Sequence, residues 1–419
     1  MKAGFGRADI TPALPCSKVG WIKDIRATNV LDPLHATALV LESGGRSLGF
    51  VSIDTLSVRR QTVALIREGI TRLGFPGDNV MVSATHNHAG PAVCNEGDVK
   101  RDDAYLEFMT GRVIDAFRQA LESRRDAEAG FGRAVEMSVA VNRRIVYRDG
   151  LVRTHGSLDN PDALFVEGPV DPEVSVMVIR EPGGHVMGAT VNYSLHPTFH
   201  GDDEYITANW PGAMAGILAG RGVPVTMYLQ GAQGNISVGD PLNRGANPGM
   251  EEVGRVMADA VERAIRAARF TEEPDIRAAS EVLALPYRTF TEDELHGRIR
   301  GAQRFVDPEA YERAIPWLLR KSKDRGGVKR AQVQALAVGG HTFVGIPAEF
   351  FVQNGLAIKE GAYPAIVHVV LANGMLGYIP HLDAFKRGGY ETTLTPGVDM
   401  APETGDLLVA AALRVIKSP

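Results

Sequence analysis

The sequence predicts an α/β protein in which mixed β-sheets are flanked by helices, folded as a single domain over residues 1–419. Short runs rich in strand-forming residues alternate with amphipathic stretches along the chain. The hydrophobic content of 44% is sufficient for a large buried core. We find no internal repeat, low-complexity tract or linker, so nothing in the sequence is expected to divide the chain.

Hydrophobic periodicity predicts the individual elements in order. Strands at 36–43 and 47–54 precede a helix at 59–74 that ends at a glycine, and a strand follows at 79–85. Apolar residues at helical spacing predict helices at 103–123 and 250–270. The remaining elements are expected as strands at 188–195, 280–288, 333–347 and 365–373 and a helix at 405–419. Charged residues predict a helical insertion at about 290–330 that ends in a solvated loop, "RKSKDRGGVKR" at 320–330.

Composition excludes several classes of protein. The formal net charge of −5 is mild for this length, so nucleic acid is not expected as a partner. Cys16 and Cys94 are too few for a disulfide framework, and the opening "MKAGFGRADITP" lacks the pattern of a secretion signal, which favours a cytoplasmic location. No apolar run reaches the length of about eighteen residues that a spanning helix needs, so no membrane partner is expected. A soluble enzyme or binding protein remains, of undetermined oligomeric state.

Two histidines lie one residue apart in "SATHNHAGP", directly after the strand expected at 79–85. Residues two apart in an extended segment point to the same face, so His86 and His88 are expected to lean into one pocket. Such a pair is a candidate metal site, and the alternative is two hydrogen-bonded structural histidines. Cys94 and the acidic stretch "NEGD" that follows are expected either at the entrance of this pocket or in a solvent loop.

Three further polar residues lie where predicted strands end. His196 precedes a proline, which favours an extended backbone at the strand exit. Glu349 is expected at the start of an amphipathic helix, where the helix dipole favours its carboxylate, and the alternative is a capping glutamate. Tyr378 lies in a loop bounded by glycine and proline, where the alternative is ordinary packing. Together these residues offer the nitrogen and oxygen donors that a catalytic zinc accepts.

Six short motifs follow one another over nearly the whole chain: "GRADITP", "SATHNHAGP", "YSLHPT", "QGAQGNIS", "GIPAEFF" and "NGMLGYIP…GGYE". Their order and approximate spacing resemble those of the neutral/alkaline ceramidase N-terminal domain family. The resemblance implies the catalytic fold of that family and a zinc-dependent amide hydrolase. Carried over by position, it implies that zinc is held by His86, His196, Glu349 and Tyr378. It leaves His88 beside the metal, as a residue that supports a ligand or handles a proton.

The resemblance also implies roles for residues around the metal. Tyr390 in "GGYE" matches a second family tyrosine, whose phenol can hydrogen-bond a developing oxyanion. Ser237 in "GNIS" matches a serine given a nucleophilic role, although Asn235 replaces the family's aspartate; the alternative is a serine that only hydrogen-bonds its surroundings. Arg143 in "VNRR" is expected to bind a substrate oxygen or carboxylate. The alternative is a surface salt bridge, for which Arg144 is an equal candidate.

These residues together predict a hydrolytic mechanism. Zinc would polarise the scissile carbonyl and lower the pKa of its bound water toward about 7. The oxyanion would be shared between the metal and Tyr390, while His88 would take a proton and return it to the leaving amine. The same chemistry permits a lactonase or esterase. The competing class is a protein that binds a metal or small molecule without turnover. It would arise if Asn235, in place of the family's aspartate, disables the loop of Ser237.

Two features favour a soluble polar amide as the substrate over ceramide. Ceramidases carry an additional β-sandwich domain, whereas this sequence ends soon after its last motif. Directly behind His196, the sequence adds His200, Asp202, Asp203 and Glu204, whose carboxylates are expected to meet a cationic or hydroxylated amine part. The alternative is that these carboxylates belong to a solvated loop. We therefore expect a small soluble N-acyl compound, with ceramide as the alternative.

Overall fold

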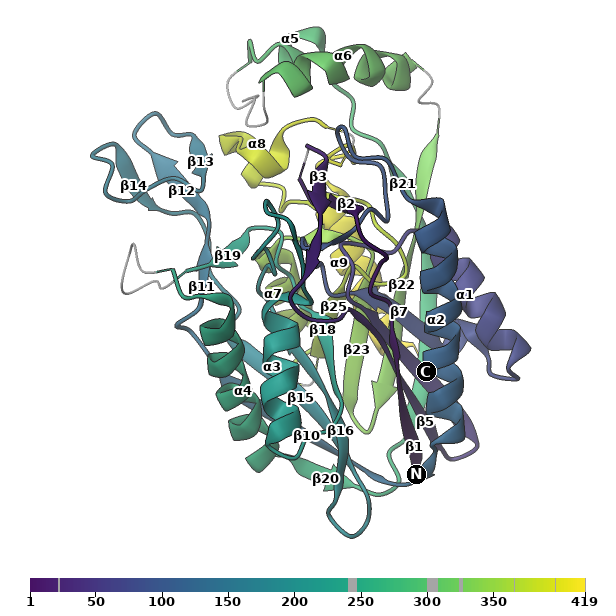
Figure 1. The fold of residues 1–419 in the computed structure, drawn as a ribbon. Helices are drawn as coiled ribbons and strands as arrows, with labels where there is room; N and C mark the ends of the chain where they lie inside the picture. Colours follow the sequence, from purple (N-terminus) through teal and green to yellow (C-terminus); the bar gives the residue numbers. More distant parts are fainter. Residues whose placement is uncertain are drawn as a thin grey trace.

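Three β-sheets with one strand pattern form the body of this mixed α/β protein (Figure 1). The computed structural model describes residues 1–21, 23–239, 247–299, 308–323, 327–364, 366–395 and 397–418. In each sheet three strands pair antiparallel in chain order, and a fourth strand, reached through a helix, pairs in parallel with the third. A second helix follows the fourth strand.

The three units that share this order differ in the elements inserted between their strands. The first comprises β1 (Lys2–Asp9), β5 (His35–Ser43), β6 (Arg46–Ile53), α1 (Arg60–Arg72), β7 (Val80–Ala84) and α2 (Asp103–Glu122). The second comprises β10 (Glu128–Val135), β15 (Glu173–Arg180), β16 (Val186–Tyr193), α3 (Asn209–Gly220), β18 (Thr226–Gln230) and α4 (Met250–Arg266). The third comprises β21 (Ile276–Pro286), β22 (Val328–Val338), β23 (His341–Ile346), α7 (Val352–Gly361), β25 (Ile366–Val370) and α9 (Thr404–Lys417).

This repetition shows that the expectation of no internal repeat is wrong. The equivalent strands β1 and β10 even carry the same hexapeptide, Ala-Gly-Phe-Gly-Arg-Ala. Its second glycine, Gly6 or Gly132, lies against the helix that covers the sheet, where a Cβ would overlap a backbone carbonyl oxygen of α2 or α4. The shared hexapeptide therefore permits close packing of a strand against a helix.

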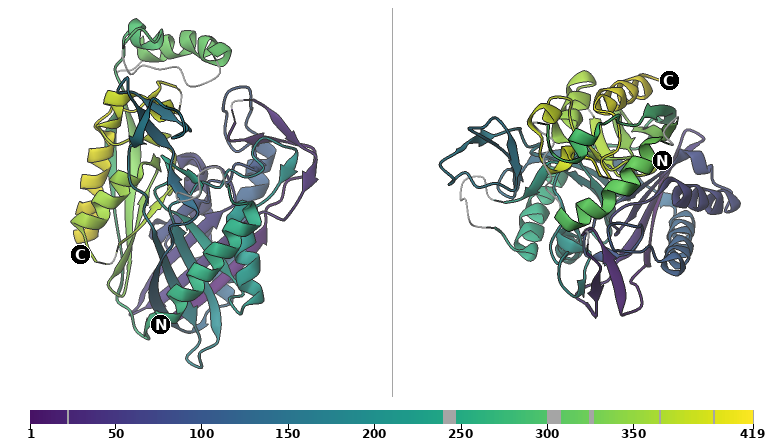
Figure 2. Two further views of the ribbon diagram at one scale, coloured as in Figure 1. Left: turned by 90° about the vertical axis from the view of Figure 1, so that its left-hand side faces the viewer. Right: turned by 90° about the horizontal axis from the view of Figure 1, so that it is seen from above.

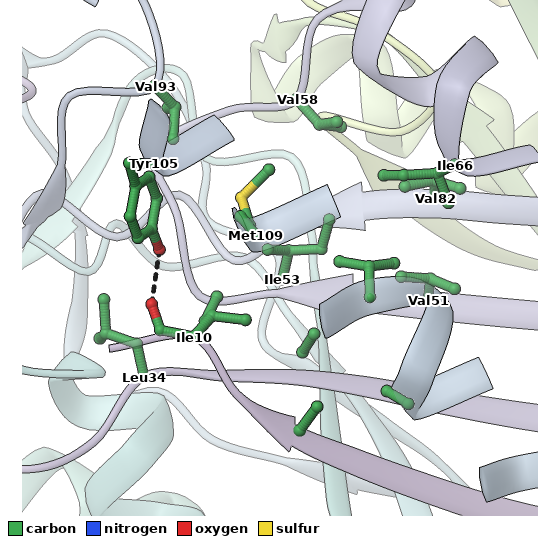
Figure 3. Packing of buried hydrophobic residues seen from close by; sticks show 14 of the residues in the cluster. Ile10, Leu34, Val51, Ile53, Val58, Ile66, Val82, Val93, Tyr105 and Met109 are labelled. Atoms are coloured by element: carbon green, nitrogen blue, oxygen red, sulfur yellow. Dashed lines mark hydrogen bonds between the residues drawn. The ribbon is translucent and has the colours of Figure 1, made fainter. Parts of the chain in front are cut away.

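The helices lie on the outside of the three sheets, and the sheets face one another in the middle (Figures 1 and 2). One apolar cluster lies between the first sheet and α1 and α2, and Figure 3 shows part of it, with the Tyr105 hydroxyl donating to the Ile10 carbonyl at 2.7 Å. A separate central cluster joins residues of all three sheets, among them Phe50, Met227 and Phe343. The strands β7 and β25 are buried along their whole length and read as short apolar runs, whereas β21, at the edge of the third sheet, is largely part-exposed.

The smaller elements mostly lie at one end of the sheets. They are β2 (Cys16–Val19), β3 (Ile25–Ala27), β4 (Asn29–Val30), β8 (Gly90–Pro91), β9 (Arg125–Asp126), β11 (Ala140–Asn142), β12 (Arg144–Tyr147), β13 (Val152–Thr154), β14 (Ala163–Val166), β17 (Tyr205–Ile206), β19 (Ile236–Val238), β20 (Arg269–Thr271), β24 (Glu349–Phe350), β26 (Tyr378–Ile379), α8 (Ala384–Arg387), and the 3-10 turns Gly77–Asn79 and Tyr390–Thr392. The strands β12, β13 and β14 form a sheet that projects from the body (Figure 1).

Between β21 and β22 the chain forms α5 (Glu292–Leu295) and α6 (Pro308–Lys323), which lie above the sheets (Figure 1). The loop expected at 320–330 is wrong at both ends, because residues 320–323 complete α6 and residues 328–330 begin β22. Residues 324–326 of that expected loop lie outside the described residues. Within the described part of the chain, no helix is both long enough and apolar enough to cross a membrane.

Candidate metal centre

The strand β7 ends at Ala84, and the chain then turns sharply at His86. His86 has a φ of 66°, so the segment is not extended and the predicted reason for pairing the two histidines is wrong. Asn87 holds the turn instead, because its backbone N–H donates to Thr55 O at 3.1 Å and its side-chain Nδ2 donates to Thr207 O at 2.7 Å. The two rings still meet, with 3.3 Å between the Nε2 atoms of His86 and His88.

His196 reaches the same place from the end of β16 in the second unit. Its Nε2 lies 3.0 Å from the Nε2 of His86. Its Nδ1 lies 3.0 Å from Gln233 O and 3.1 Å from Ile236 O, two carbonyls of the glycine-containing loop "QGAQGNIS". That loop therefore fixes the orientation of the imidazole, and all three rings are buried.

The backbone fixes the tautomer of each histidine. The Nδ1 of His86 lies 2.9 Å from Leu56 O and that of His88 lies 3.1 Å from Gly20 O, as His196 Nδ1 does from its carbonyls. A carbonyl only accepts, so each Nδ1 carries a proton, and the Nε2 atoms of His88 and His196 both face that of His86. Burial, followed by the charge of His86, lowers the pKa of His88 and His196 well below its usual value, so neither is protonated at neutral pH. The three Nε2 atoms therefore form a group that could hold a metal ion.

Glu349 supplies a carboxylate to this cluster, but not from the start of a helix as expected. It lies in the two-residue strand β24, and α7 begins only at Val352. Its Oε2 lies 3.2 Å from His86 Nε2 and 3.8 Å from His196 Nε2. Metal–ligand bonds of about 2.0–2.1 Å in a tetrahedron place neighbouring ligand atoms about 3.3 Å apart. The three separations from His86 Nε2, to His196 Nε2, Glu349 Oε2 and His88 Nε2, are 3.0, 3.2 and 3.3 Å and match that spacing, and Glu349 Oε2 lies 3.8 Å from His196 Nε2.

The two tyrosines lie beside the cluster. β24 pairs in parallel with β26, which places Tyr378 opposite Glu349. The Tyr378 and Tyr390 rings meet edge to face with centroids 5.5 Å apart. Burial, and then the charge of Glu349, raises the pKa of Tyr378; burial, and then the charges of Glu96 and Glu349, raises the pKa of Tyr390. Tyr390 is therefore a protonated hydrogen-bond donor at neutral pH.

Arg143 and Arg144 form a buried ion-pair network, so the alternative of a surface salt bridge does not describe them. Arg143 donates from Nε to Glu391 Oε1 at 2.8 Å and from Nη2 to the Tyr378 hydroxyl at 3.1 Å. Arg144 donates from Nη1 to Glu391 Oε2 at 2.8 Å. Although burial opposes ionisation, the two guanidinium groups lower the pKa of Glu391 to about 2. The carboxylate is therefore ionised at neutral pH.

Ser237 lies in β19, opposite Val141 of β11, and is partly exposed. The replacement at Asn235 has a structural explanation. Its Nδ2 donates to Gln353 Oε1 at 2.8 Å, and its Oδ1 accepts the backbone N–H of Val352 at 2.9 Å. Both ends of the amide therefore hold the start of α7, whereas an aspartate could hold Gln353 only by accepting from its Nε2 after that amide turned round.

The three carboxylates behind His196 differ in their surroundings, and Asp203 is engaged with its neighbours. Asp203 lies 3.6 Å from the buried Lys18 Nζ, and its Oδ2 lies 2.6 Å from His200 Nδ1. Asp202 and Glu204 are exposed. Cys94 is buried, and burial raises the pKa of its thiol.

The sequence analysis missed Glu96, Glu391 and Trp21. Burial, and then the charge of Glu349, raises the pKa of Glu96, and the charge of Glu96 in turn raises that of Tyr390, so Glu96 is electrostatically coupled to the cluster, as the acidic stretch "NEGD" partly indicated. Trp21 is 41% exposed, and its ring lies 6.3 Å from that of His88, which places it at the rim. For Glu391 the only signal was its position directly after Tyr390.

Comparisons with known proteins show that the chain is similar to neutral ceramidase in sequence and in structure. The neutral ceramidase of Pseudomonas aeruginosa is 28% identical over 207 residues, which are 46% of this chain and 30% of that protein. Its crystal structure aligns with a TM-score of 0.73 at 18% identity, covering 98% of this chain and 74% of that one. A ceramidase structure described as complexed with C2 gives a TM-score of 0.74 at 18% identity, covering 99% and 75%. No protein-family model matches the chain.

The sequence match thus spans less than a third of the length of the curated relative. The comparisons confirm the predicted resemblance and the mixed α/β fold. The three histidines form a group whose ligand atoms all lie within 4.8 Å of one another, in keeping with a bound metal.

Proposed function

Because the chain is similar to neutral ceramidase in sequence and shares its fold, we propose that it is a zinc-dependent hydrolase that cleaves an amide bond of a soluble polar N-acyl substrate. The observation that carries this proposal is the convergence of imidazole nitrogens and the Glu349 carboxylate on His86 at distances that suit a tetrahedral site.

We assign the zinc to His86, His196, Glu349 and Tyr378. A divalent metal held there would act as a Lewis acid on the scissile carbonyl and on a water molecule. His88 Nε2, 3.3 Å from His86 Nε2, lies within reach of the same position. The zinc affinities of Tyr378→Phe and His88→Ala therefore separate a ligand from a neighbour. A larger loss for His88→Ala would move His88 into the ligand set.

The residues around the metal site support the acyl-transfer chemistry of an amide hydrolase. Tyr390 remains protonated, so its hydroxyl can donate to the carbonyl oxygen as negative charge develops on it. His88 Nδ1 is held by Gly20 O, which leaves Nε2 facing the cluster, and we propose that this atom takes the proton and returns it to the departing amine. Ser237 follows Ile236, whose carbonyl oxygen lies 3.1 Å from His196 Nδ1, and we keep it as a candidate nucleophile.

The substrate class rests on the polar surroundings of the cluster. Glu96, Arg143 and the two tyrosines bring charges and hydroxyl groups to the site. These groups suit a substrate with hydrogen-bonding groups on both sides of the amide. We propose a cytoplasmic enzyme that acts on a small-molecule amide, without nucleic acid or membrane as partner.

A substrate panel tests this proposal. The zinc-loaded protein is incubated with short-chain N-acyl ceramide in detergent and, separately, with N-acyl amino acids, N-acyl amino sugars, N-acyl amines and lactones. His196→Ala serves as the inactive control. Turnover of a soluble amide above ceramide supports the proposal. Ceramide turnover above every soluble amide, lactone cleavage alone, or no turnover with zinc retained would each overturn it.

A further inference from the structure

The projecting sheet of β12, β13 and β14 is joined to the candidate metal centre by buried charges. Arg144 opens β12 and is 0% exposed, although the sheet itself stands out from the body (Figure 1). Thr154 is the last residue of β13, and its side chain points towards Glu391, as that of Arg144 does. Both residues contact Glu391, which lies in the 3-10 turn that carries Tyr390.

Glu391 collects donors from both sides of this junction. Its Oε1 accepts from Arg143 Nε at 2.8 Å. Its Oε2 accepts from Arg144 Nη1 at 2.8 Å and from Thr154 Oγ1 at 2.9 Å. The carboxylate is 0% exposed, so charged hydrogen bonds replace all of its water. Such a group is held in one position.

Arg143 links Glu391 to Tyr378, a residue of the candidate metal site. With Nε on Glu391, its Nη2 donates to Gly234 O at 2.8 Å and to the Tyr378 hydroxyl at 3.1 Å. The guanidinium carbon also lies 5.6 Å from the centre of the Tyr378 ring. The orientation of this phenol therefore depends on the orientation of Arg143.

The second tyrosine is held from the same junction. The backbone N–H of Tyr390 donates to Thr154 Oγ1 at 3.1 Å, and that hydroxyl in turn donates to Glu391. Next to it, Gly389 has a φ of 113° and lies against the guanidinium of Arg144, so no side chain fits there. The backbone on both sides of Tyr390 is therefore held by contacts with Thr154 and Arg144, the same residues that bind Glu391.

Stability alone does not explain this network. Burying two guanidinium groups and their carboxylates is expensive, and apolar residues of similar volume are often as stable or more so. What apolar residues cannot do is hold a guanidinium at one angle against a phenol. We propose that Glu391 is a positioning residue that fixes Arg143 and the two tyrosines, and that the β12–β14 sheet is thereby a working part of the site. This inference rests on the proposed function for its effect on turnover.

Glu167 offers a matched control. Its carboxylate accepts from Arg144 Nε and Nη2 and its side chain is 3% exposed, so it is a second, largely buried partner of the same arginine. No contact in the described part of the chain joins it to Arg143 or to either tyrosine. Glu391→Gln and Glu167→Gln therefore each remove one negative partner of the buried Arg144. Only Glu391→Gln also removes the negative partner of Arg143.

The experiment compares the two variants in turnover and in near-ultraviolet circular dichroism, which reports fixed aromatic packing. Tyr378→Phe first defines the part of the spectrum that this ring contributes. Glu391→Gln is expected to lose that part, to bind zinc more weakly because Tyr378 is an assigned ligand, and to lower kcat about 10- to 100-fold at saturating zinc. Glu167→Gln is expected to keep both the spectrum and kcat.

Equal effects of the two variants on kcat and spectrum would overturn the inference. Thr154→Val removes the hydroxyl without stranding a charge, so it provides the test if Glu391→Gln does not fold. It is expected to change the same spectral band, and an unchanged band would count against the inference. The spectrum needs no turnover, so a protein that hydrolyses nothing on the panel would refute the proposed function and leave this test intact.

Discussion

Replacing His86 with asparagine removes the residue on which the candidate metal centre converges. The Nε2 of His86 lies 3.0 Å from that of His196, 3.3 Å from that of His88 and 3.2 Å from Glu349 Oε2. Asparagine is chosen because it tolerates the left-handed backbone, with φ at 66°. The substitution should therefore remove the ligand without breaking the turn.

The expected loss of zinc affinity follows from the number of ligands. If four ligands share the roughly 10–16 kcal/mol typical of a protein zinc site, one of them accounts for about 2.5–4 kcal/mol. That is a loss of about a hundredfold to a thousandfold in affinity. Leu56 O also loses its donor, which destabilises the fold by about 1–3 kcal/mol with or without metal.

The measurement is a zinc competition titration against a chromophoric chelator, for the parent protein and the His86→Asn variant. His200→Asn is the matched control, because His200 also has a positive φ, of 55°, and pairs with Asp203 outside the cluster. Its affinity should equal that of the parent protein. A His86→Asn variant that binds zinc as tightly as the control would refute the assignment of this cluster as the metal site.

Three further predictions concern catalysis, pH and the junction with the projecting sheet. Tyr390→Phe should keep its zinc and turn over about 10²-fold more slowly, as expected for loss of one oxyanion donor, and an unchanged rate in a steady-state assay would place the phenol outside the chemistry. Burial, followed by the charge of Lys359, lowers the pKa of His368 to about 4. The unfolded chain, with a histidine pKa of about 6.5, therefore takes up a proton that the folded protein does not, so about 3 kcal/mol of stability should be lost as pH falls from about 6.5 to 4. The free energy of unfolding in urea should depend less on pH in His368→Gln than in the parent protein over that range. An identical dependence would contradict the lowered pKa of His368. Gly389→Ala introduces a side chain at a φ of 113° against Arg144, so thermal unfolding should show a loss of at least about 1–3 kcal/mol, whereas a wild-type melting temperature would show that the junction is loose.

Sequence reasoning located much of the candidate site because its residues follow strands, and strands are read from local periodicity. His86, His196 and Glu349 were each placed at a strand end, and the three strand ends do converge. The local conformations were less predictable. The left-handed turn at His86 depends on contacts of Asn87 with Thr55 and Thr207, which are distant in sequence.

Long-range pairing explains what the sequence did not reveal. Glu391 acts through Arg143, 248 positions earlier in the chain, and nothing local to either residue indicates the other. The threefold repetition left a readable trace in only two of the units, the hexapeptide shared by β1 and β10. Elsewhere the units share topology and helix packing, which many different apolar sequences can satisfy.

Zinc-dependent amide hydrolysis is the central claim, and one reversible experiment tests it most directly. The protein is assayed on the best soluble N-acyl substrate before chelation, after removal of metal, and after zinc is returned in stoichiometric amount. We predict that hydrolysis disappears with the metal and returns with about one zinc per chain, and that His196→Ala, which lacks one of the converging Nε2 atoms, does not recover. Hydrolysis that persists in the metal-free protein, or that fails to return with bound zinc, would contradict the account.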